Sequence, residues 1–349
     1  MATPACFGWP AWNIQISCRS SITPVSARPC WGKKSGTTVI RNTGAVMFGP
    51  KDSEVIAGTL AAAHDLPVVR LTREELQQRL PQHRNPKLDH IGIWDPEASV
   101  AHPEAGINPA VDAARAAGAT IYTDTMVKGI ELIDGGVIVT APMHRFTVDQ
   151  VVVTAGAWLN KLVSELPLTP LRRPIMWFKP ADRSDPSFGL ENFPTFIHAV
   201  NAENWFWGHG SGNGFAVKVG PDRDPNYREV DPDTIDRGIS PAGWKLVSEL
   251  VSKALPGLNP IPVLTTNCMV THSPDGRCQI GRPYNDPRLI VSVGCCGHAF
   301  KHAGGIGEII AQMPTPRGRS SISTSWIQPG FSAAKIERRP ARSVHRPRI

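Results

Sequence analysis

Two buried strands that each run directly into a glycine turn limit the folds open to this chain of 349 residues. Residues 150–154 (QVVVT) continue into the turn 155–157 (AGA), and residues 289–293 (LIVSV) enter the turn 294–297 (GCCG). The first turn leads into a predicted helix from about Trp158. Junctions from strand through glycine turn to helix are where α/β proteins bind nucleotides. The pattern therefore predicts an α/β domain with a nucleotide-binding edge.

Short strands separated by turn residues predict a second, antiparallel sheet. They are expected at residues 177–180, 195–200, 205–207 and 215–219. The 31 Gly and 33 Pro also favour many turns over a helical bundle. A second domain is expected to start near Leu168.

Local signals predict the remaining elements. Thr72 is a predicted N-cap with Glu75 at the capping-box position. A hairpin is expected around the turn 134–136 (DGG). The other expected elements are helices at 54–64, 108–117, 231–235 and 244–254, a last helix near Gly304, Gly305 and Gly307, and a strand at 120–123.

The formal charge of +7 is confined to one end of the chain. Residues 314–349 hold eight Lys or Arg and one acid, whereas residues 1–313 hold 29 basic and 29 acidic side chains. DNA binding by the folded body therefore has no support, and a nucleic-acid or acidic partner would have to bind the tail. The Arg, Pro and Ser content of this tail predicts disorder.

The cysteines and the hydropathy exclude several protein classes. Seven cysteines are an odd number, with no CxxC pair and no Cys/His spacing that builds a zinc site, so we expect reduced thiols, a cytoplasmic protein and no metal. No stretch approaches the roughly 18 consecutive apolar residues of a membrane span. We therefore expect a protein without a membrane partner.

The candidate chemical groups are ambiguous when each is taken alone. Residues 294–301 (GCCGHAFK) place a lysine after a glycine turn, which suits an anion but also fits an ordinary turn with a solvated lysine. Cys268 lies beside a predicted strand, and a single cysteine is commonly a small buried hydrophobe.

Seven ordered blocks together resemble one family, the monomeric sarcosine oxidase and N-methyltryptophan oxidase group of FAD-dependent amine oxidases. The resemblance covers roughly residues 42 to 312. The blocks are 42–50 (NTGAVMFGP), 94–98 (WDPEA), 151–158 (VVVTAGAW), 215–220 (FAVKVG), 231–234 (DPDT), 268–276 (CMVTHSPDG) and 297–309 (GHAFK with GEI).

The resemblance implies a role for each matching residue. Cys268 matches the cysteine that binds the flavin covalently, followed by Met269, and Lys218 matches a lysine near flavin N5 that promotes the reaction with O₂. Lys301 matches the lysine that pairs with the substrate carboxylate. The cofactor is expected to lie against Gly156, Gly294, Gly297, His298 and Phe300, and the substrate also against Trp207 and Asp222.

The implied reaction is oxidation of a secondary amine. FAD is the expected cofactor, and an N-alkyl amino acid and O₂ are the expected small-molecule partners of a monomer. The products would be an imine, hydrolysed to an aldehyde, and H₂O₂.

The resemblance also implies a domain order. We expect an irregular leader (1–41), which an organellar transit peptide would also explain, then a partial FAD-binding domain with substrate-domain insertions (42–167). An antiparallel substrate domain (168–262), a return to the FAD-binding domain (263–313) and the basic tail (314–349) complete the expected α/β fold.

The sequence departs from the family pattern at both ends. No G-x-G-x-x-G occurs in the 349 residues, although the family begins with this pyrophosphate-binding turn. The family's Arg-containing stretch, which supplies the second cationic contact to the substrate carboxylate, is also absent. Val270, Trp207, Asp222, Cys295 and Ala299 replace usual site residues. A truncated or frameshifted, non-catalytic homologue unable to hold FAD is therefore the alternative expectation.

Overall fold

The computed structural model describes residues 5–7, 38–63, 66–84, 86–164, 166–201, 204–212, 214–221 and 228–313. The strands are β1 (Ala5–Phe7), β2 (Ile40–Asn42), β3 (Ala45–Pro50), β4 (Val69–Leu71), β5 (His90–Asp95), β6 (Ser99–Ala101), β7 (Gly129–Ile133), β8 (Gly136–Ala141), β9 (His144–Val148), β10 (Val151–Val153), β11 (Thr169–Phe178), β12 (Thr195–Ala199), β13 (Trp205–His209), β14 (Val217–Pro221), β15 (Leu264–His272), β16 (Gln279–Gly281) and β17 (Leu289–Val293). The helices are α2 (Glu54–Ala62), α3 (Arg73–Arg79), α4 (Pro103–Ala116), α5 (Leu159–Leu162), α6 (Pro241–Ala254) and α7 (Ala299–Gln312), with short 3₁₀ turns η2 (Gly156–Trp158), η3 (Pro186–Phe188) and η4 (Pro283–Asn285).

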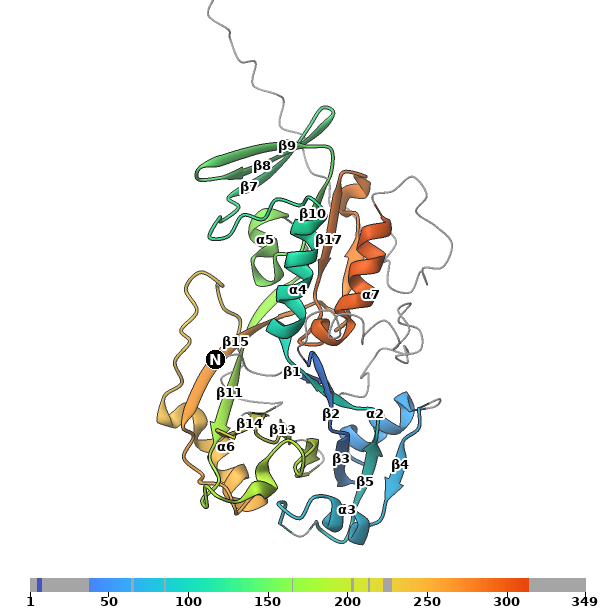
Figure 1. The fold of residues 1–349 in the computed structure, drawn as a ribbon, viewed down its shortest axis with the longest axis vertical. Coiled ribbons are helices and arrows are strands. Elements are labelled where there is room, and N and C mark those ends of the chain that lie inside the picture. The colour runs from blue at the N-terminus through green and yellow to red at the C-terminus, as the bar shows by residue number, and fades with distance from the viewer. Residues whose placement is uncertain are drawn as a thin grey trace, which may run out of the picture.

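These elements form a mixed α/β fold, as expected. An eight-stranded sheet in the order β15-β11-β14-β13-β12-β3-β5-β4 occupies the lower half of the view in Figure 1. It is antiparallel except where β12 pairs with β3 in parallel. The upper half contains the sheet β10-β17-β16, with α7 beside it and the sheet β7-β8-β9 at the top.

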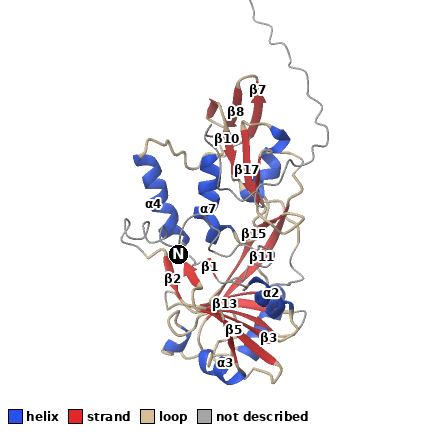
Figure 2. Cartoon of the chain, turned by 90° about the vertical axis from the view of Figure 1, so that its right-hand side faces the viewer, coloured by secondary structure: helices blue, strands red, loops and turns tan. Residues whose placement is uncertain are grey.

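The long strands β11 and β15 connect the two halves. They pair antiparallel over nine residue pairs, from Thr169 opposite His272 to Trp177 opposite Leu264. Figure 2 shows both strands running from the eight-stranded sheet toward β10 and β17. Side chains on this ribbon can therefore contribute to a site that both halves share.

One face of the eight-stranded sheet forms the main hydrophobic core. In β11 the even-numbered residues from Pro170 to Phe178 are buried, as the two-residue period of a strand requires. Met176 and Phe178 pack with Val247 and Val251 of α6, all four fully buried. Burial of one such side chain contributes about 1.5–3 kcal/mol. Helix α6 therefore fixes which face of β11 is inside.

Several locally encoded predictions are confirmed. Thr72 caps α3 in a capping box with Glu75, and β7 and β8 form the hairpin around Asp134-Gly135-Gly136. Predicted strands coincide with β10, β12, β13 and β17, and the helix at 244–254 is part of α6.

Other local predictions are wrong. Residues 120–123 form no strand, and residues 231–235 form a turn instead of a helix. Asp231 and Asp233 in that turn bind Lys161, and their side chains thereby stabilise a non-helical backbone. Helix α4 starts at Pro103 rather than at residue 108, because Pro suits the first helical turn, and it continues through Pro109. The predicted last helix, by contrast, is confirmed, because Gly304, Gly305 and Gly307 lie inside α7.

The ends of the chain are described only in part. Within the leader predicted as irregular, Ala5–Phe7 and Ile40–Asn42 both pair with β6. The tail 314–349 lies outside the described residues. No helix in the described ranges is long and apolar enough to cross a membrane.

Candidate active site

The side chains of Cys268 and Lys218 emerge from the same face of the large sheet. Directly paired residues of neighbouring antiparallel strands lie on one face. Arg173 pairs with Cys268, and Trp177, two pairs further along β11 on the same face, pairs with Lys218. This is the face opposite the α6 core. The two positions on β11 are four residues apart, about 13 Å at 3.3 Å per residue.

Lys218 lies between two tryptophans. Its ammonium is 5.8 Å from the ring of Trp177 and 5.7 Å from the ring of Trp207, within the range of cation–π attraction. The Trp207 ring covers Gly220, where an added Cβ would lie only 2.4 Å from the indole. Glycine at 220 therefore lets the indole lie flat on the strand next to Lys218.

Trp207 also has a polar atom that no described residue satisfies. Its side chain is 9% exposed, and its buried Nε1 has no hydrogen-bond partner among the residues that the structure describes. A buried N–H left without an acceptor is costly. The indole therefore offers a hydrogen bond on the face that carries Lys218 and Cys268.

Cys268 and Met269 point to opposite faces of β15. Cys268 is half-buried opposite Arg173, whereas Met269 pairs with Arg172, whose side chain is directed to the other face. Of these two neighbours, only Cys268 therefore shares a face with Lys218.

The two glycine turns lie at one edge of the small sheet. Strands β10 and β17 are parallel, so the turns that follow them are adjacent. Gly156, Gly294 and Gly297 have φ values of 54°, 71° and 85°, in the left-handed region that favours glycine. An added Cβ at Gly156 would meet nothing within 4 Å, so the backbone there faces open space.

The second turn packs against the β15 end of the ribbon. His272 and Cys295 form an isolated bridge, and the Cys296 N–H donates to the Thr271 carbonyl at 3.2 Å. Gly297 lies beside Arg173, whose Nη1 would be 3.8 Å from a Cβ at this position. The fold thereby brings Gly297 next to the strand pair that carries Cys268.

His298 lies among positive charges. Burial, together with the charges of Lys301 and Arg173, lowers the pKa of its imidazole to about 3. The imidazole is therefore neutral at pH 7 and can accept or donate one hydrogen bond at each nitrogen. Two cations near one neutral ring form a place suited to a carboxylate.

Phe300 lies apart from this face, and Asp222 is not among the residues that the structure describes. Phe300 points toward α4, where its ring carbon Cζ would lie 3.6 Å from a Cβ at Gly106.

Arg173 is the site residue that the sequence interpretation missed. The strand that carries it was expected to begin at residue 177, eight residues later than the start of β11 at Thr169. No local pattern identified it, because the inward positions of β11 include Pro170, Arg172 and Pro174 and do not alternate in polarity with their neighbours.

A metal centre finds no support within the described ranges. They contain no group of three or more His, Cys, Asp or Glu side chains arranged to hold a metal ion.

Comparisons with known proteins agree with this arrangement. The sequence matches the family described as FAD dependent oxidoreductase over residues 27–313. It is 29% identical to monomeric sarcosine oxidase of Bacillus sp. (strain B-0618), over 80% of this chain and 73% of that protein. It is 26% identical to N-methyl-L-tryptophan oxidase of Yersinia pestis (strain Pestoides F), over 83% of this chain and 78% of that protein.

A solved structure has the same fold. A mutant of NikD, an unusual amino acid oxidase essential for nikkomycin biosynthesis, superimposes with a TM-score of 0.81 at 19% identity, over 97% of this chain and 89% of that one. Since the family match spans most of the described chain, the protein belongs to the FAD dependent oxidoreductase family.

Proposed function

We propose that this protein oxidises a secondary amine of the N-alkyl amino acid type with O₂, giving an imine, its aldehyde hydrolysis product and H₂O₂. The names of the sarcosine and N-methyltryptophan oxidases among its relatives support this substrate class. The observation that carries the proposal is the clustering of Arg173 and Lys301 near His298, at the end of the face that bears Cys268 and Lys218.

The described residues fit the ring end of FAD. A flat polar ring needs small residues at its edge and a hydrogen-bond donor not used by the protein, and Gly156 faces open space while the buried Trp207 Nε1 lacks a partner among the described residues. We assign Cys268 to the covalent link, with Met269 beside it, and the backbone of Gly156, Gly294, Gly297, His298 and Phe300 to cofactor contacts. Bound FAD supplies a two-electron acceptor for the amine and a donor for O₂.

Lys218 is the proposed catalytic residue. Its ammonium lies close to two indoles and the residue as a whole is 7% exposed, so it acts where water screens charge weakly. A fixed cation stabilises negative charge as it develops on reduced oxygen. It does so without the reorganisation that water would require.

Lys301 and Arg173 are proposed to hold the substrate carboxylate. Arg173 would supply the second cationic contact to the carboxylate, which the sequence lacks in the family's usual stretch. A guanidinium presents two parallel N–H donors and fixes the orientation of a carboxylate, whereas Lys301 adds a point charge. Trp207 and Asp222 would line the substrate side of the pocket. We also propose that the protein is a monomer, because the name of the related sarcosine oxidases describes those proteins as monomeric.

A non-catalytic homologue unable to hold FAD is the second candidate. The absence of G-x-G-x-x-G from the whole sequence favours it, because this turn binds the pyrophosphate in dinucleotide-binding folds. The two candidates differ in one visible property, the presence of flavin on the purified chain.

The colour of the purified protein separates the two candidates. We expect a yellow protein whose flavin stays on the chain after acid precipitation, and loss of that bound colour in Cys268→Ala. Cys278→Ala is the matched control and should keep the flavin attached. A colourless protein that takes up no added FAD would establish the non-catalytic candidate.

A further inference from the structure

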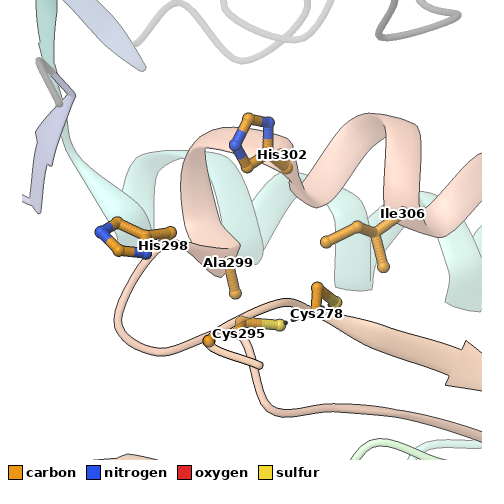
Figure 3. A pocket seen from close by; sticks show the side chains of 7 residues that line it. Cys278, Cys295, His298, Ala299, His302 and Ile306 are labelled. Carbon is orange, nitrogen blue, oxygen red and sulfur yellow. Dashed lines mark hydrogen bonds between the residues drawn. The ribbon is translucent and has the colours of Figure 1, made fainter. Parts of the chain in front are cut away.

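Two thiols, Cys278 and Cys295, face each other where the Gly294–Gly297 turn follows β17. Gln279 pairs with Val293 across β16 and β17, so Cys278 and Cys295 lie just beyond the paired ends of these strands. Their sulfur atoms are 3.0 Å apart, as the dashed line in Figure 3 marks. Neither is among the groups assigned to cofactor or substrate above.

The environment makes the two sulfurs chemically unequal. The hydrogen bond that Cys295 donates to the Cys278 sulfur lowers the pKa of the Cys278 thiol, and a hydrogen bond from Ser292 lowers it further. The same contact, together with burial, raises the pKa of Cys295. Because the thiolate is the nucleophile, Cys278 is the attacking sulfur and Cys295 keeps the proton.

A small hollow gives the pair access to a reagent. It is lined by Gly276, His298, Ala299, His302 and Ile306 as well as by both cysteines (Figure 3). Its room is about that of one water molecule, enough for one of the two oxygens of H₂O₂ to reach the sulfurs. The rings of His298 and His302 point away from the two sulfurs (Figure 3), so the sulfurs are the reactive groups that the hollow presents.

We propose that Cys278 and Cys295 form a redox-active dithiol that a peroxide converts into a disulfide. The Cys278 thiolate attacks one oxygen of H₂O₂, the O–O bond breaks, and hydroxide leaves as Cys278 becomes a sulfenic acid. The Cys295 sulfur then displaces the sulfenic oxygen, which leaves as water with the remaining protons. Overall, two thiols and one H₂O₂ give one disulfide and two waters.

The disulfide would tie the start of β16 to the turn that carries Gly294 and Gly297. The source of the peroxide rests on the proposed function, because H₂O₂ is a product of that reaction. The chemistry of the pair does not, since any added peroxide serves as oxidant. The proposal therefore adds to the site a modification that the H₂O₂ released by the proposed reaction can cause.

Peptide mapping of the full-length protein after treatment with added H₂O₂ tests the pair directly. Free thiols are blocked first, and the protein is then cleaved with trypsin without reduction. We expect residues 278–288 and 289–301 to be joined, lighter by two hydrogens than the separate peptides, and separated again by a thiol reductant. The proposal is overturned if the two peptides stay unlinked and alkylated under a peroxide treatment that oxidises other cysteines of the protein.

A variant resolves which neighbour forms the link, because Cys295 and Cys296 share the second peptide. The cross-link should persist in Cys296→Ser and disappear in both Cys278→Ser and Cys295→Ser. A cross-link that persists in Cys295→Ser but disappears in Cys296→Ser would assign the chemistry to Cys296 and overturn the proposed pair. These results do not depend on amine oxidation, so failure of the proposed function leaves them intact.

Discussion

At the scale of single residues, Lys218 illustrates how packing gives a charge its effect. Its ammonium lies between the rings of Trp177 and Trp207 and has little contact with solvent. Water would otherwise screen the charge, and the indoles limit the directions in which it can point. The position of this cation is therefore set by the sheet register rather than by a flexible surface chain.

Replacing Lys218 by methionine should slow the reaction of the reduced enzyme with O₂ by about 100-fold or more, the effect of removing one preorganised charge-stabilising group. Stopped-flow mixing of the anaerobically reduced protein with O₂ measures this step. Lys179→Met, which removes a lysine over the Phe215 ring, is the matched control and should leave the rate unchanged. An unaltered rate in Lys218→Met would contradict the role.

Arg173→Gln should weaken binding of substrates that carry a carboxylate. The loss of a charge-assisted hydrogen bond of about 1.5–3 kcal/mol corresponds to a KM roughly 10- to 150-fold higher. Steady-state assays should compare an N-methyl amino acid with the same amine lacking its carboxylate. Because only the first compound contacts the guanidinium, an equal loss for both compounds would show that Arg173 does not bind the carboxylate.

Three buried histidines should make the fold sensitive to acid. Burial lowers the pKa of His83 to about 3 and that of His198 well below 6.5, and the pKa of His90 is lowered as well, with Lys87 and Asp89 the nearby charges. The unfolded chain therefore binds more protons below pH 6.5. The free energy of unfolding should fall by about 1.4 kcal/mol per pH unit for each neutral histidine as the pH drops from 6.5 toward 3.

Urea unfolding at pH 7, 6 and 5 measures this dependence. The ring of His83 packs edge-on against Phe48 and Phe196, so phenylalanine can replace it without introducing a charge. His83→Phe should give a smaller decrease with falling pH, whereas His144→Phe on the exposed strand β9 should not. Equal slopes in wild type and His83→Phe would rule out His83 as a source of the acid sensitivity.

At the scale of elements, the sequence analysis predicted those helix ends and turns that interactions between nearby residues determine. The capping box at Thr72 and the hairpin at 134–136 involve residues a few positions apart, and both are confirmed. Arg173 was missed because its partner on β15, Cys268, is distant in sequence. The turn at 231–235 was mistaken for a helix because its aspartates bind a lysine 70 residues away.

The capping box provides a test of local stability. Thr72→Ala should lower the free energy of unfolding by about 1 kcal/mol, because the Glu75 N–H loses the acceptor now at 3.2 Å. Chemical denaturation measures the change. Thr120→Ala, in an exposed segment without regular structure, is the control and should change stability little.

At the scale of the whole molecule, the excess positive charge lies in a different part of the chain from the residues that match the family. The body to residue 313 carries equal numbers of basic and acidic side chains, and the excess lies in residues 314–349. We expect any retention of the full chain on a DNA column to decrease steeply with salt and to vanish when these residues are removed. Retention of the shortened chain at the same salt concentration would place the binding surface on the folded body instead.

The β11–β15 ribbon has a consequence for how such a chain can change over time. Side chains alternate between its faces, so the gain or loss of one residue within β11 would turn Arg173 and Trp177 inward and expose Arg172 and Met176. A single insertion or deletion would thereby remove Arg173 and Trp177 from the face that bears Cys268 and Lys218. Length variation is consequently tolerable in the connecting loops, whereas this ribbon can diversify only by substitution.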